Sequence, residues 1–422
     1  MSRWHESSCI NPDVVWDSSA EAPRCRVCNA RCAINELRFD QPKSPNLVLP
    51  PNEPHGQLNL RWPSSVFPSP PAVSPSASRP DPPTREKTGG TAPPSVVYGQ
   101  QLKPGEFRLA SLSAVEGGQV DQPVHLALET YQRDNCPEYE TVSYTWGGEN
   151  GDYTLSHPIF IGPHWDVLFQ SRNCWEMMRF IRPRRGVRLV WVDAVCINQS
   201  DIDERGEQVS SMGDIYRHCS RVVVYLGPDV VPTPRDGRFP PRHPLHKIDE
   251  VLQSPRFDLP KLLARSYFGR SWMIQELVLA PSAIFHVAGV DFWTDTSGIC
   301  RMRSPSSAKW DWDATPAPWF QHIGQGEFPT RDLYDILRLT SNSRASDPRD
   351  RVFGILGLLQ RGDEGMKEHP EDYSQLQPDY SLSAQQVFIG VVAHLIINCE
   401  AKAILYHAVG TSGPDKSLTW MP

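Results

Sequence analysis

The chain has 422 residues, a formal net charge of −7 and 41 prolines, which is long enough for two or three domains but too rich in proline for all of it to be packed. The acidic balance and the lack of a strongly basic segment argue against nucleic acid as the main partner. The ten cysteines are too few for a disulfide scaffold in a chain of this length, so we expect most of them to be free thiols.

The two ends of the chain carry no targeting or membrane signal. The start, MSRWHESSC, lacks the apolar run of a signal peptide. The longest apolar stretch, Val387–Ile397, is shorter than the roughly 20 residues that a bilayer-spanning helix needs. We therefore expect a soluble cytoplasmic protein without a transmembrane segment. The last residues, SLTWMP, lack a helix cap or a polar tail, which fits a truncated or incomplete product.

Residues 1–40 form a short segment that contains four cysteines. Cys25 and Cys28 make a CxxC pair, Cys32 follows four residues later, and Cys9 precedes them. Four thiolates are a common ligand set for a structural zinc ion, so these residues are a candidate zinc site. The segment is short and its spacing matches no strong template, so free thiols remain the alternative.

Residues 41–96 have the composition of a linker. Fifteen of the prolines lie there, mixed with Ser, Asn and Thr. Such a sequence buries too little apolar surface to offset the entropy of ordering the chain, so we expect it to be disordered.

Beyond residue 97 the apolar spacing predicts alternating strands and helices. Strands are expected at Phe107–Leu112, Val124–Leu128, Tyr139–Thr145, Val222–Leu226 and Ala283–Val287. Helices are expected at Ser171–Ile181, Leu259–Ser266, Trp272–Ala280, Leu333–Ser341, Arg351–Leu359 and Ala384–Asn398. Residues 228–257 are typical of a surface insertion, and residues 290–328 show no clear period. The pattern indicates an α/β protein.

The stretch Leu189–Gly227 predicts one strand-turn-helix-strand unit. Its first strand ends on Asp193, and a polar turn follows with Cys196 and two amides, Asn198 and Gln199; the helix after the turn carries Arg205 and Gln208. Open α/β sheets bind ligands outside the carboxyl ends of their strands. Asp193 would bind a sugar hydroxyl or orient a partner there. The alternative is an ordinary turn, because Asp and Asn favour such positions.

The segment YETVSYTWGG predicts a strand that ends in Trp146 and Gly147. A glycine lets the backbone approach a ligand closely, and the tryptophan would stack on a ring. A buried strand with a tight turn and a core tryptophan is the simpler interpretation.

The segment RSWMIQEL places Glu276 one helical turn after Trp272, on the same face of a helix that begins near Arg270. A partly desolvated carboxylate beside an aromatic side chain is typical of a catalytic or sugar-binding group. The alternative is a structural ion pair between Glu276 and Arg270, with Trp272 in the core.

Together these segments resemble the fungal heterokaryon-incompatibility (HET) domain. The matching blocks, in order, are YETVSYTWG, LVWVDAVCINQSDIDERGEQVSSMGDIYRHCSRVVVYLG, YFGRSWMIQELVLA and SDPRDRVFGILGL, while SLTWMP resembles the start of a segment found beyond that domain. The resemblance implies a HET domain over residues 97–360 and a helical C-terminal extension over residues 361–422. It also implies a fungal, cytosolic protein that acts with incompatibility partners in non-self recognition and regulated cell death.

The HET domain is similar in turn to TIR domains, which implies a TIR-like or flavodoxin-like parallel sheet flanked by helices. The TIR signature places a serine two residues before its tryptophan, whereas Ser271 directly precedes Trp272; the spacing from Trp272 to Glu276 agrees. Enzymatic TIR domains cleave NAD with this glutamate, so the resemblance implies Glu276 as the key carboxylate of an NAD glycohydrolase. Asp193 and Arg270 would support Glu276, NAD would be the substrate, and no cofactor would be required.

Two other functions stay open. In one, the domain is a non-enzymatic module that self-associates to signal, and residues 41–96 tether a recognition segment to it. In the other, the N-terminal cysteines make the chain a zinc-dependent regulator.

Overall fold

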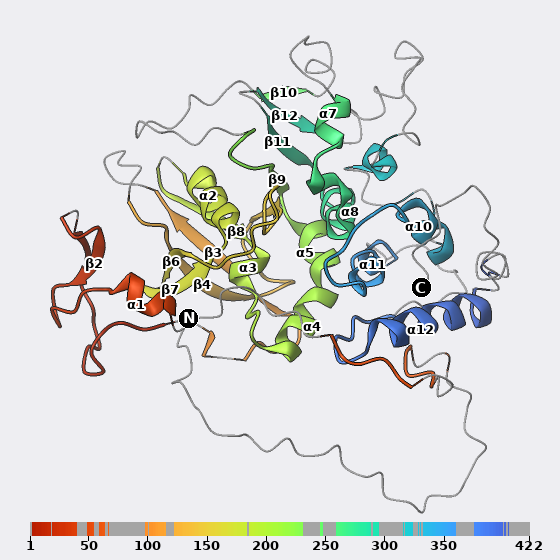
Figure 1. The fold of residues 1–422 in the computed structure, drawn as a ribbon. Coiled ribbons are helices and arrows are strands. Elements are labelled where there is room, and N and C mark those ends of the chain that lie inside the picture. The colour runs from red at the N-terminus through yellow and green to blue at the C-terminus, as the bar shows by residue number, and fades with distance from the viewer. Residues whose placement is uncertain are drawn as a thin grey trace, which may run out of the picture.

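The computed structural model describes residues 2–39, 49–66, 98–114, 122–230, 245–247, 259–294, 315–359 and 375–404, with short gaps inside these ranges. Most of the predicted linker 41–96, most of the predicted insertion 228–257 and the SLTWMP end lie outside the described residues. The described chain builds a ten-stranded sheet in the order β10-β12-β11-β9-β5-β8-β3-β4-β6-β7, with helices on both faces (Figure 1).

Four parallel strands form the centre of this sheet. They are β8 (Val187–Trp191), β5 (Glu140–Tyr144), β9 (Arg221–Tyr225) and β11 (Ala283–Val287). In chain order these strands read 2-1-3-4, which is the flavodoxin-like winding. All five residues of β5 are buried, as expected for a strand that is covered on both faces. The predicted α/β class with a parallel core flanked by helices is confirmed.

Both flanks of the sheet contain antiparallel pairs, so the sheet as a whole is mixed. On one side β3 (Glu106–Ser113) pairs antiparallel with β8 and with β4 (His125–Gln132). Then β6 (His157–Ile161) pairs parallel with β4, and the hairpin partner β7 (Asp166–Gln170) is the last strand. On the other side β12 (Val290–Thr294) pairs antiparallel with β11, and β10 (Leu245–Lys247) follows.

Helices cover the two faces of the central strands. Helix α2 (Arg172–Ile181) packs on the face that carries Tyr144 and Tyr225. Helix α8 (Ser271–Val278) packs on the opposite face, against Ser143. Successive residues of a strand point to opposite faces, so Ser143 and Tyr144 separate these two layers.

The connections between strands carry the remaining helices of the central domain. The bounds are α3 (Asp193–Cys196), α4 (Ile202–Ser210), α5 (Met212–His218), α7 (Leu259–Leu263) and a 3-10 turn at Ser266–Gly269. Helix α4 is capped by Asp201, whose carboxylate accepts from the backbone N–H groups of Asp203 and Glu204. Helix α5 lies on the α8 side, where the Tyr216 ring meets Trp191.

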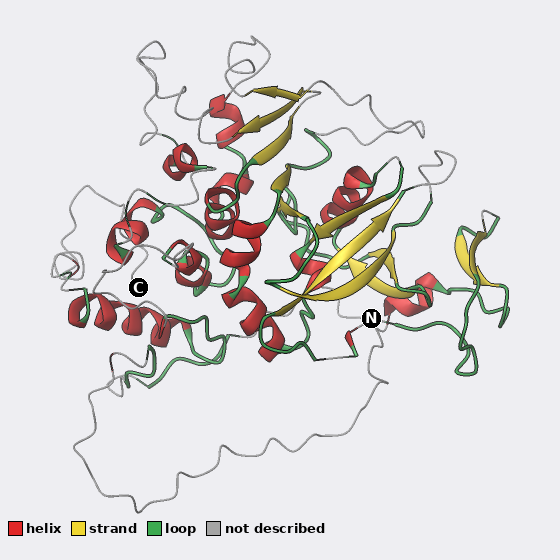
Figure 2. Cartoon of the chain, turned by 180° about the vertical axis from the view of Figure 1, so that it is seen from behind, coloured by secondary structure: helices red, strands yellow, loops and turns green. Residues whose placement is uncertain are grey.

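The two ends of the described chain pack on opposite sides of the sheet, as the front and back views both show (Figures 1 and 2). The N-terminal elements are β1 (Val14–Asp17), β2 (Ala22–Cys25) and α1 (Ile34–Phe39), and they lie beside β6 and β7. The C-terminal elements are the 3-10 turn Pro318–His322, α10 (Leu333–Leu339), α11 (Asp350–Phe353), the 3-10 turn Leu356–Leu358 and α12 (Ala384–Ile397). Among the residues described, no helix is long and apolar enough to cross a bilayer.

One part of the predicted linker contacts the C-terminal helices. The side chain of Trp62 is buried, and its indole N–H donates to the Gln377 carbonyl at 2.9 Å. The Trp62 backbone lies directly on Gly390 of α12, where a Cβ would meet the Trp62 carbonyl oxygen at 1.9 Å. Helix α12 therefore needs a glycine at this position.

Candidate functional site

Two carboxyl groups of the central domain lie near one another at the carboxyl ends of the parallel strands. Asp193 lies two residues beyond the end of β8 and begins α3, and Glu276 projects from α8. Burial raises the pKa of both carboxyl groups, and the negative charge of Asp193 adds to the raised pKa of Glu276. The sequence placed these two groups 83 positions apart, and the fold brings them into one electrostatic cluster.

Glu276 is enclosed, with a side chain that is 4% exposed. The Ser143 hydroxyl donates to its Oε2 at 2.5 Å, and the Tyr267 hydroxyl lies 2.5 Å from the Ser143 oxygen. Burial raises the pKa of Glu276 to about 8, and the negative charge of Asp193 adds to this shift, whereas the Ser143 hydrogen bond and Arg270 oppose it. At neutral pH most of the Glu276 carboxyl is therefore protonated.

Asp193 is held by a short network at the end of β8. Its Oδ2 accepts from the Trp146 indole N–H at 2.8 Å, and its Oδ1 accepts from the Ala194 backbone N–H at 2.7 Å. The Gln199 side-chain amide donates to the Asp193 carbonyl at 2.9 Å. Burial raises the pKa of Asp193, against the effect of these hydrogen bonds and of Arg270. The indole N–H of Trp146 thereby fixes the position of the Asp193 carboxylate.

Arg270 supplies positive charge to both acids. It precedes the first residue of α8, and its charge lowers the pKa of Glu276 and of Asp193. Its Nη1 is buried and makes no hydrogen bond within the described part of the chain. A buried guanidinium N–H without an acceptor is costly, so this group is ready to donate to an anion or to a hydroxyl oxygen.

The winding of the sheet reverses between β5 and β9, and this is the point where open α/β sheets bind ligands. Gly148 and Gly227 follow these two strands with φ of +60° and +109°. Asn173 of α2 donates to the Thr145 carbonyl at 2.5 Å, while its buried Oδ1 accepts no hydrogen bond among the described residues. A Cβ on Gly148 would lie 3.5 Å from that oxygen, so Asn173 faces the glycine turn.

The structure brings together four of the predicted site residues, Trp146, Asp193, Arg270 and Glu276, and Gln199 supports the cluster by donating to the Asp193 carbonyl. Gly147 has a structural reason for its small size, because a Cβ there would meet the Gly151 backbone at 2.9 Å.

Four other predicted residues have their contacts elsewhere. The Asn198 side chain accepts from the Ser200 backbone N–H within its own turn. Arg205 lies over the Tyr380 ring at 4.7 Å, and Gln208 donates to the Glu106 carbonyl at 2.8 Å. The Trp272 indole hydrogen-bonds Asp350, which faces the C-terminal helices. The contacts of Arg205 and Trp272 join the central domain to the C-terminal elements, whereas those of Asn198 and Gln208 stay within the domain.

Sequence reasoning missed the hydroxyl groups around Glu276 and the amide at the strand reversal. Ser143 lies inside a segment already recognised as a strand, and strand alternation places it opposite Tyr144. Tyr216 also hydrogen-bonds Glu276, and Tyr267 reaches Ser143 from the loop before α8. Asn173 lies in the first turn of α2, which begins after the Ser171 cap. The spacing of these residues along the sequence does not indicate which groups their side chains contact in the fold.

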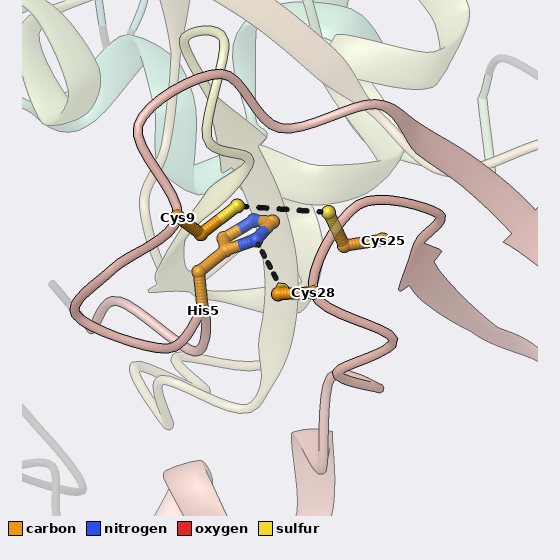
Figure 3. A group of neighbouring side chains, drawn as sticks. All are labelled: His5, Cys9, Cys25 and Cys28. Atoms are coloured by element: carbon orange, nitrogen blue, oxygen red, sulfur yellow. Dashed lines mark hydrogen bonds between the residues drawn. The ribbon is translucent and has the colours of Figure 1, made fainter.

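The N-terminal cysteines form a separate cluster with a histidine. His5 Nδ1 or Nε2 and the sulfurs of Cys9, Cys25 and Cys28 all lie within 4.8 Å of one another (Figure 3). Cys32, one of the four ligands predicted from the sequence, is not in this group; its buried side chain packs with Phe160, Val167 and Phe169. The structure therefore supports a His/Cys cluster capable of holding a metal ion, with His5 in place of Cys32.

Comparisons with known proteins agree with the segments identified above. The family model described as "Heterokaryon incompatibility protein (HET)" matches residues 139–276, which include both carboxyl groups of the cluster. The chain is 25% identical over 327 residues to heterokaryon incompatibility protein 6, OR allele, of Neurospora crassa, a match covering 60% of this chain and 46% of that protein. It is 24% identical over 225 residues to vegetative incompatibility protein HET-E-1 of Podospora anserina, covering 53% of this chain and 14% of that protein.

The matched part is less than half of either relative's length. No solved structure matches the chain significantly. The family match and the two fungal relatives agree on one assignment: the chain contains a HET domain at residues 139–276.

Proposed function

We propose that this HET domain hydrolyses NAD at the bond between nicotinamide and ribose. Nicotinamide leaves as a neutral molecule and takes the electron pair of the C–N bond with it, which leaves an oxocarbenium-like ribosyl cation. Water then adds to the anomeric carbon and releases one proton, so the products are nicotinamide and ADP-ribose. A carboxylate beside the ribose stabilises the cation, as in glycoside cleavage.

The observation that carries this proposal is the raised pKa of Glu276 beside a second acid. Isosteric neutral side chains would fill the same space without the penalty of a buried ionisable group. Acids with strongly shifted pKa values that cluster at strand ends are typical of functional sites. Glu276 with a pKa of about 8 is ready to ionise when a cationic group approaches, because opposite charge favours the ionised form.

The neighbouring groups have complementary roles in this proposal. Arg270 offers its free N–H to a ribose hydroxyl or to a phosphate oxygen of the dinucleotide. Asp193 orients Trp146, which leaves the face of that half-buried ring for stacking. Trp272 takes no part, because its indole is committed to Asp350. The turn at Gly148 and Gly227 lies at the strand reversal, where the rest of the dinucleotide would bind.

The biological role that fits this activity is heterokaryon incompatibility. The names of both relatives refer to incompatibility, and depletion of NAD would give such a protein a route to cell death. The partners would be proteins of incompatibility signalling, the site of action the cytoplasm, and assembly of several copies a means of activation. Glu276 is enclosed by Ser143 and Tyr267, so assembly would also have to open the site.

The experiment uses the full chain at high concentration with NAD, and follows nicotinamide and ADP-ribose by chromatography. Wild type is compared with Glu276→Gln, which keeps the shape of the side chain and removes its ionisation. The matched control is Asp350→Asn, because Asp350 is another buried acid with a raised pKa but lies by the C-terminal helices. We expect release by wild type and by Asp350→Asn, and a loss of about 100-fold or more in Glu276→Gln, since electrostatic stabilisation by one group has that magnitude.

A second function is favoured by one observation. The buried Glu276 carboxyl is hydrogen-bonded to Ser143 and Tyr216 inside the domain, which also suits a structural role in a module that signals by self-association. In that case concentrated, assembled wild-type protein releases no nicotinamide, and Glu276→Gln assembles as wild type does. Analytical ultracentrifugation of the same samples separates this result from a failure to assemble.

A further inference from the structure

Residues 2–39 form a small unit with very little apolar core of its own. Apart from Pro23, Cys9, Cys25 and Cys32, the residues of this unit whose burial is described contribute no buried apolar side chain, and Ile10 and Val27 are 80% and 58% exposed. Units of fewer than about 40 residues usually need a metal ion, disulfides or a partner surface to hold one structure. The cysteines of this unit are free thiols, so a metal ion is the cross-link that its composition allows.

The His/Cys cluster already has the dimensions of a tetrahedral zinc site. Two ligands at the usual zinc–sulfur distance of 2.3 Å lie about 3.8 Å apart in a tetrahedron, and a sulfur and a nitrogen ligand lie about 3.6 Å apart. The sulfurs of Cys9 and Cys25 are 3.8 Å apart, and Cys28 Sγ lies 3.6 Å from His5 Nδ1 (Figure 3). Both pairs match edges of such a tetrahedron.

The local backbone explains how these ligands converge. Strands β1 and β2 form a hairpin in which Val14 pairs with Cys25, the last residue of β2. The chain then turns through Asn29, whose φ of 57° reverses its direction, and the Cys25 N–H donates to the Ala30 carbonyl. The backbone N–H groups of Val27 and Cys28 point at the Cys25 sulfur. Such N–H donors stabilise a metal-bound thiolate.

His5 connects this cluster to the sheet. Its Nδ1 faces Cys28, while its Nε2 lies 2.7 Å from the His164 carbonyl oxygen. A histidine that binds a metal through one ring nitrogen usually donates its other N–H to a carbonyl or a carboxylate, which fixes the ring. His5 makes both of these contacts, and its second partner belongs to the loop that leads into β7.

The contact of His5 is one of four successive contacts. Ser2 and Val167 exchange both backbone hydrogen bonds, at 2.9 and 2.8 Å, and Arg3 pairs with Asp166 through two bonds of 3.0 Å. The Trp4 indole N–H donates to the Trp165 carbonyl at 2.8 Å. The N-terminal residues therefore lie along the outer side of β7, the last strand of the sheet. Covering this strand satisfies backbone groups that would otherwise be exposed for pairing with another chain.

We propose that His5, Cys9, Cys25 and Cys28 bind one zinc ion, and that this ion fixes residues 2–39 on the outer strand β7 of the HET-domain sheet. Three thiolates and one imidazole in tetrahedral geometry select zinc among the common divalent ions, and a site with four protein ligands is structural. Loss of the ion frees His5 and releases the edge of β7. Strand β7 also contacts the candidate site, because Gln170 donates to the Ala194 carbonyl next to Asp193.

The first experiment measures the metal content of the full chain purified in a reducing buffer, by elemental mass spectrometry. We expect about one zinc per chain in wild type and in Cys32→Ser, because Cys32 is the matched control that lies outside the ligand set. His5→Ala and Cys28→Ser should lose at least tenfold in zinc affinity. Cobalt(II) added to the metal-free protein should give the intense visible spectrum of a tetrahedral thiolate site, and this spectrum should weaken in His5→Ala.

The second measurement tests docking by hydrogen exchange at the Val167 amide, which donates to the Ser2 carbonyl. Exchange should accelerate at least tenfold in Cys28→Ser and after zinc removal. It should also accelerate in Arg3→Ala, which removes the pair with Asp166 while the zinc remains bound. The proposal is overturned if wild-type protein purified in a reducing buffer contains no metal. It is also overturned if Cys32→Ser loses zinc while His5→Ala retains it, or if hydrogen exchange at Val167 is unchanged after the metal is removed.

Discussion

The Ser143 hydroxyl donates a 2.5 Å hydrogen bond to the buried carboxyl group of Glu276, and this bond joins the central strand β5 to helix α8. This bond gives one carboxyl oxygen of Glu276 a hydrogen-bond donor, but the serine carries no positive charge that would balance the ionised carboxylate. Burial still raises the pKa of Glu276 to about 8, with Asp193 nearby adding to the shift. We therefore expect a neutral side chain at this position to give a more stable domain at pH 8 than the acid does.

The first prediction concerns stability against pH. The pKa of Glu276 is about 8 in the folded protein and about 4.3 in an unfolded chain, so the folded state keeps a proton that the unfolded state releases. Stability therefore falls as pH rises between these values and levels off above pH 8, by an amount on the order of 5 kcal/mol. Glu276→Gln should match wild type near pH 5 and exceed it at pH 8, measured by urea unfolding.

Asp350→Asn is the control for this first prediction. The pKa of Asp350 is raised by burial to about 6, so this substitution should alter the pH slope only below about pH 6. Parallel stability curves for wild type and Glu276→Gln from pH 5 to pH 8 would contradict the raised pKa of Glu276.

The second prediction concerns the pH dependence of NAD cleavage. If the ionised form of Glu276 stabilises the ribosyl cation, kcat/KM should rise with pH to a plateau above about pH 8, since this ratio reports the pKa of the free enzyme. Asp193→Asn removes a nearby negative charge and should move the midpoint to lower pH. Rates measured from pH 5.5 to pH 9.5 check both, and a midpoint unchanged in Asp193→Asn would show that the two acids are not coupled.

The third prediction compares two helical glycines. A Cβ at Gly390 would meet the Trp62 carbonyl oxygen at 1.9 Å, so Gly390→Ala must displace Trp62 or α12 and should destabilise the protein by roughly 1–3 kcal/mol. Gly206 lies in α4 with no atom within 4 Å of an added Cβ, so Gly206→Ala should stabilise by roughly 0.5–1 kcal/mol. Urea unfolding of both variants shows whether each substitution lowers or raises the free energy of unfolding. An unchanged free energy of unfolding in Gly390→Ala would contradict the close packing.

The fourth prediction concerns the buried ion pair between Arg108 and Glu204. Their side chains are 3% and 5% exposed, and the guanidinium Nη1 lies 2.6 Å from the carboxylate. Removal of one partner leaves an unpaired buried charge, so Arg108→Met or Glu204→Met should each cost about 3–5 kcal/mol. The double variant should lose less than either single one. Additive losses in a double-mutant cycle would show that the two charges do not depend on each other.

The sequence predicted the elements that are long, apolar and regular. Tyr139–Thr145 and Val222–Leu226 were recognised because strands buried on both faces are continuous apolar runs, and the structure has β5 and β9 there. Helix α12 was recognised from its spacing and has a full capping box at Ser383 and Gln386. The hairpin of β6 and β7 was missed, since its strands are short and Pro158 within β6 argues against a strand.

Partners far apart in sequence explain what was missed at the two sites. Helical spacing placed Trp272 on the face of Glu276, but only tertiary packing decides that Trp272 meets Asp350 while Glu276 meets Ser143, which is 133 residues away. At the N-terminus nothing in the sequence distinguishes the four cysteines from one another as metal ligands. The fold turns Cys32 toward Phe160 and Phe169 and brings in His5, which no cysteine template contains.

The most direct test of the central claim is a paired measurement on Glu276→Gln at pH 8, namely its unfolding free energy and its rate of nicotinamide release from NAD. We predict a variant that is more stable than wild type and that has lost its activity, because burial disfavours the ionised form of Glu276 and the proposed function requires that form. A variant that is less stable than wild type, or one that cleaves NAD at the wild-type rate, would contradict the account.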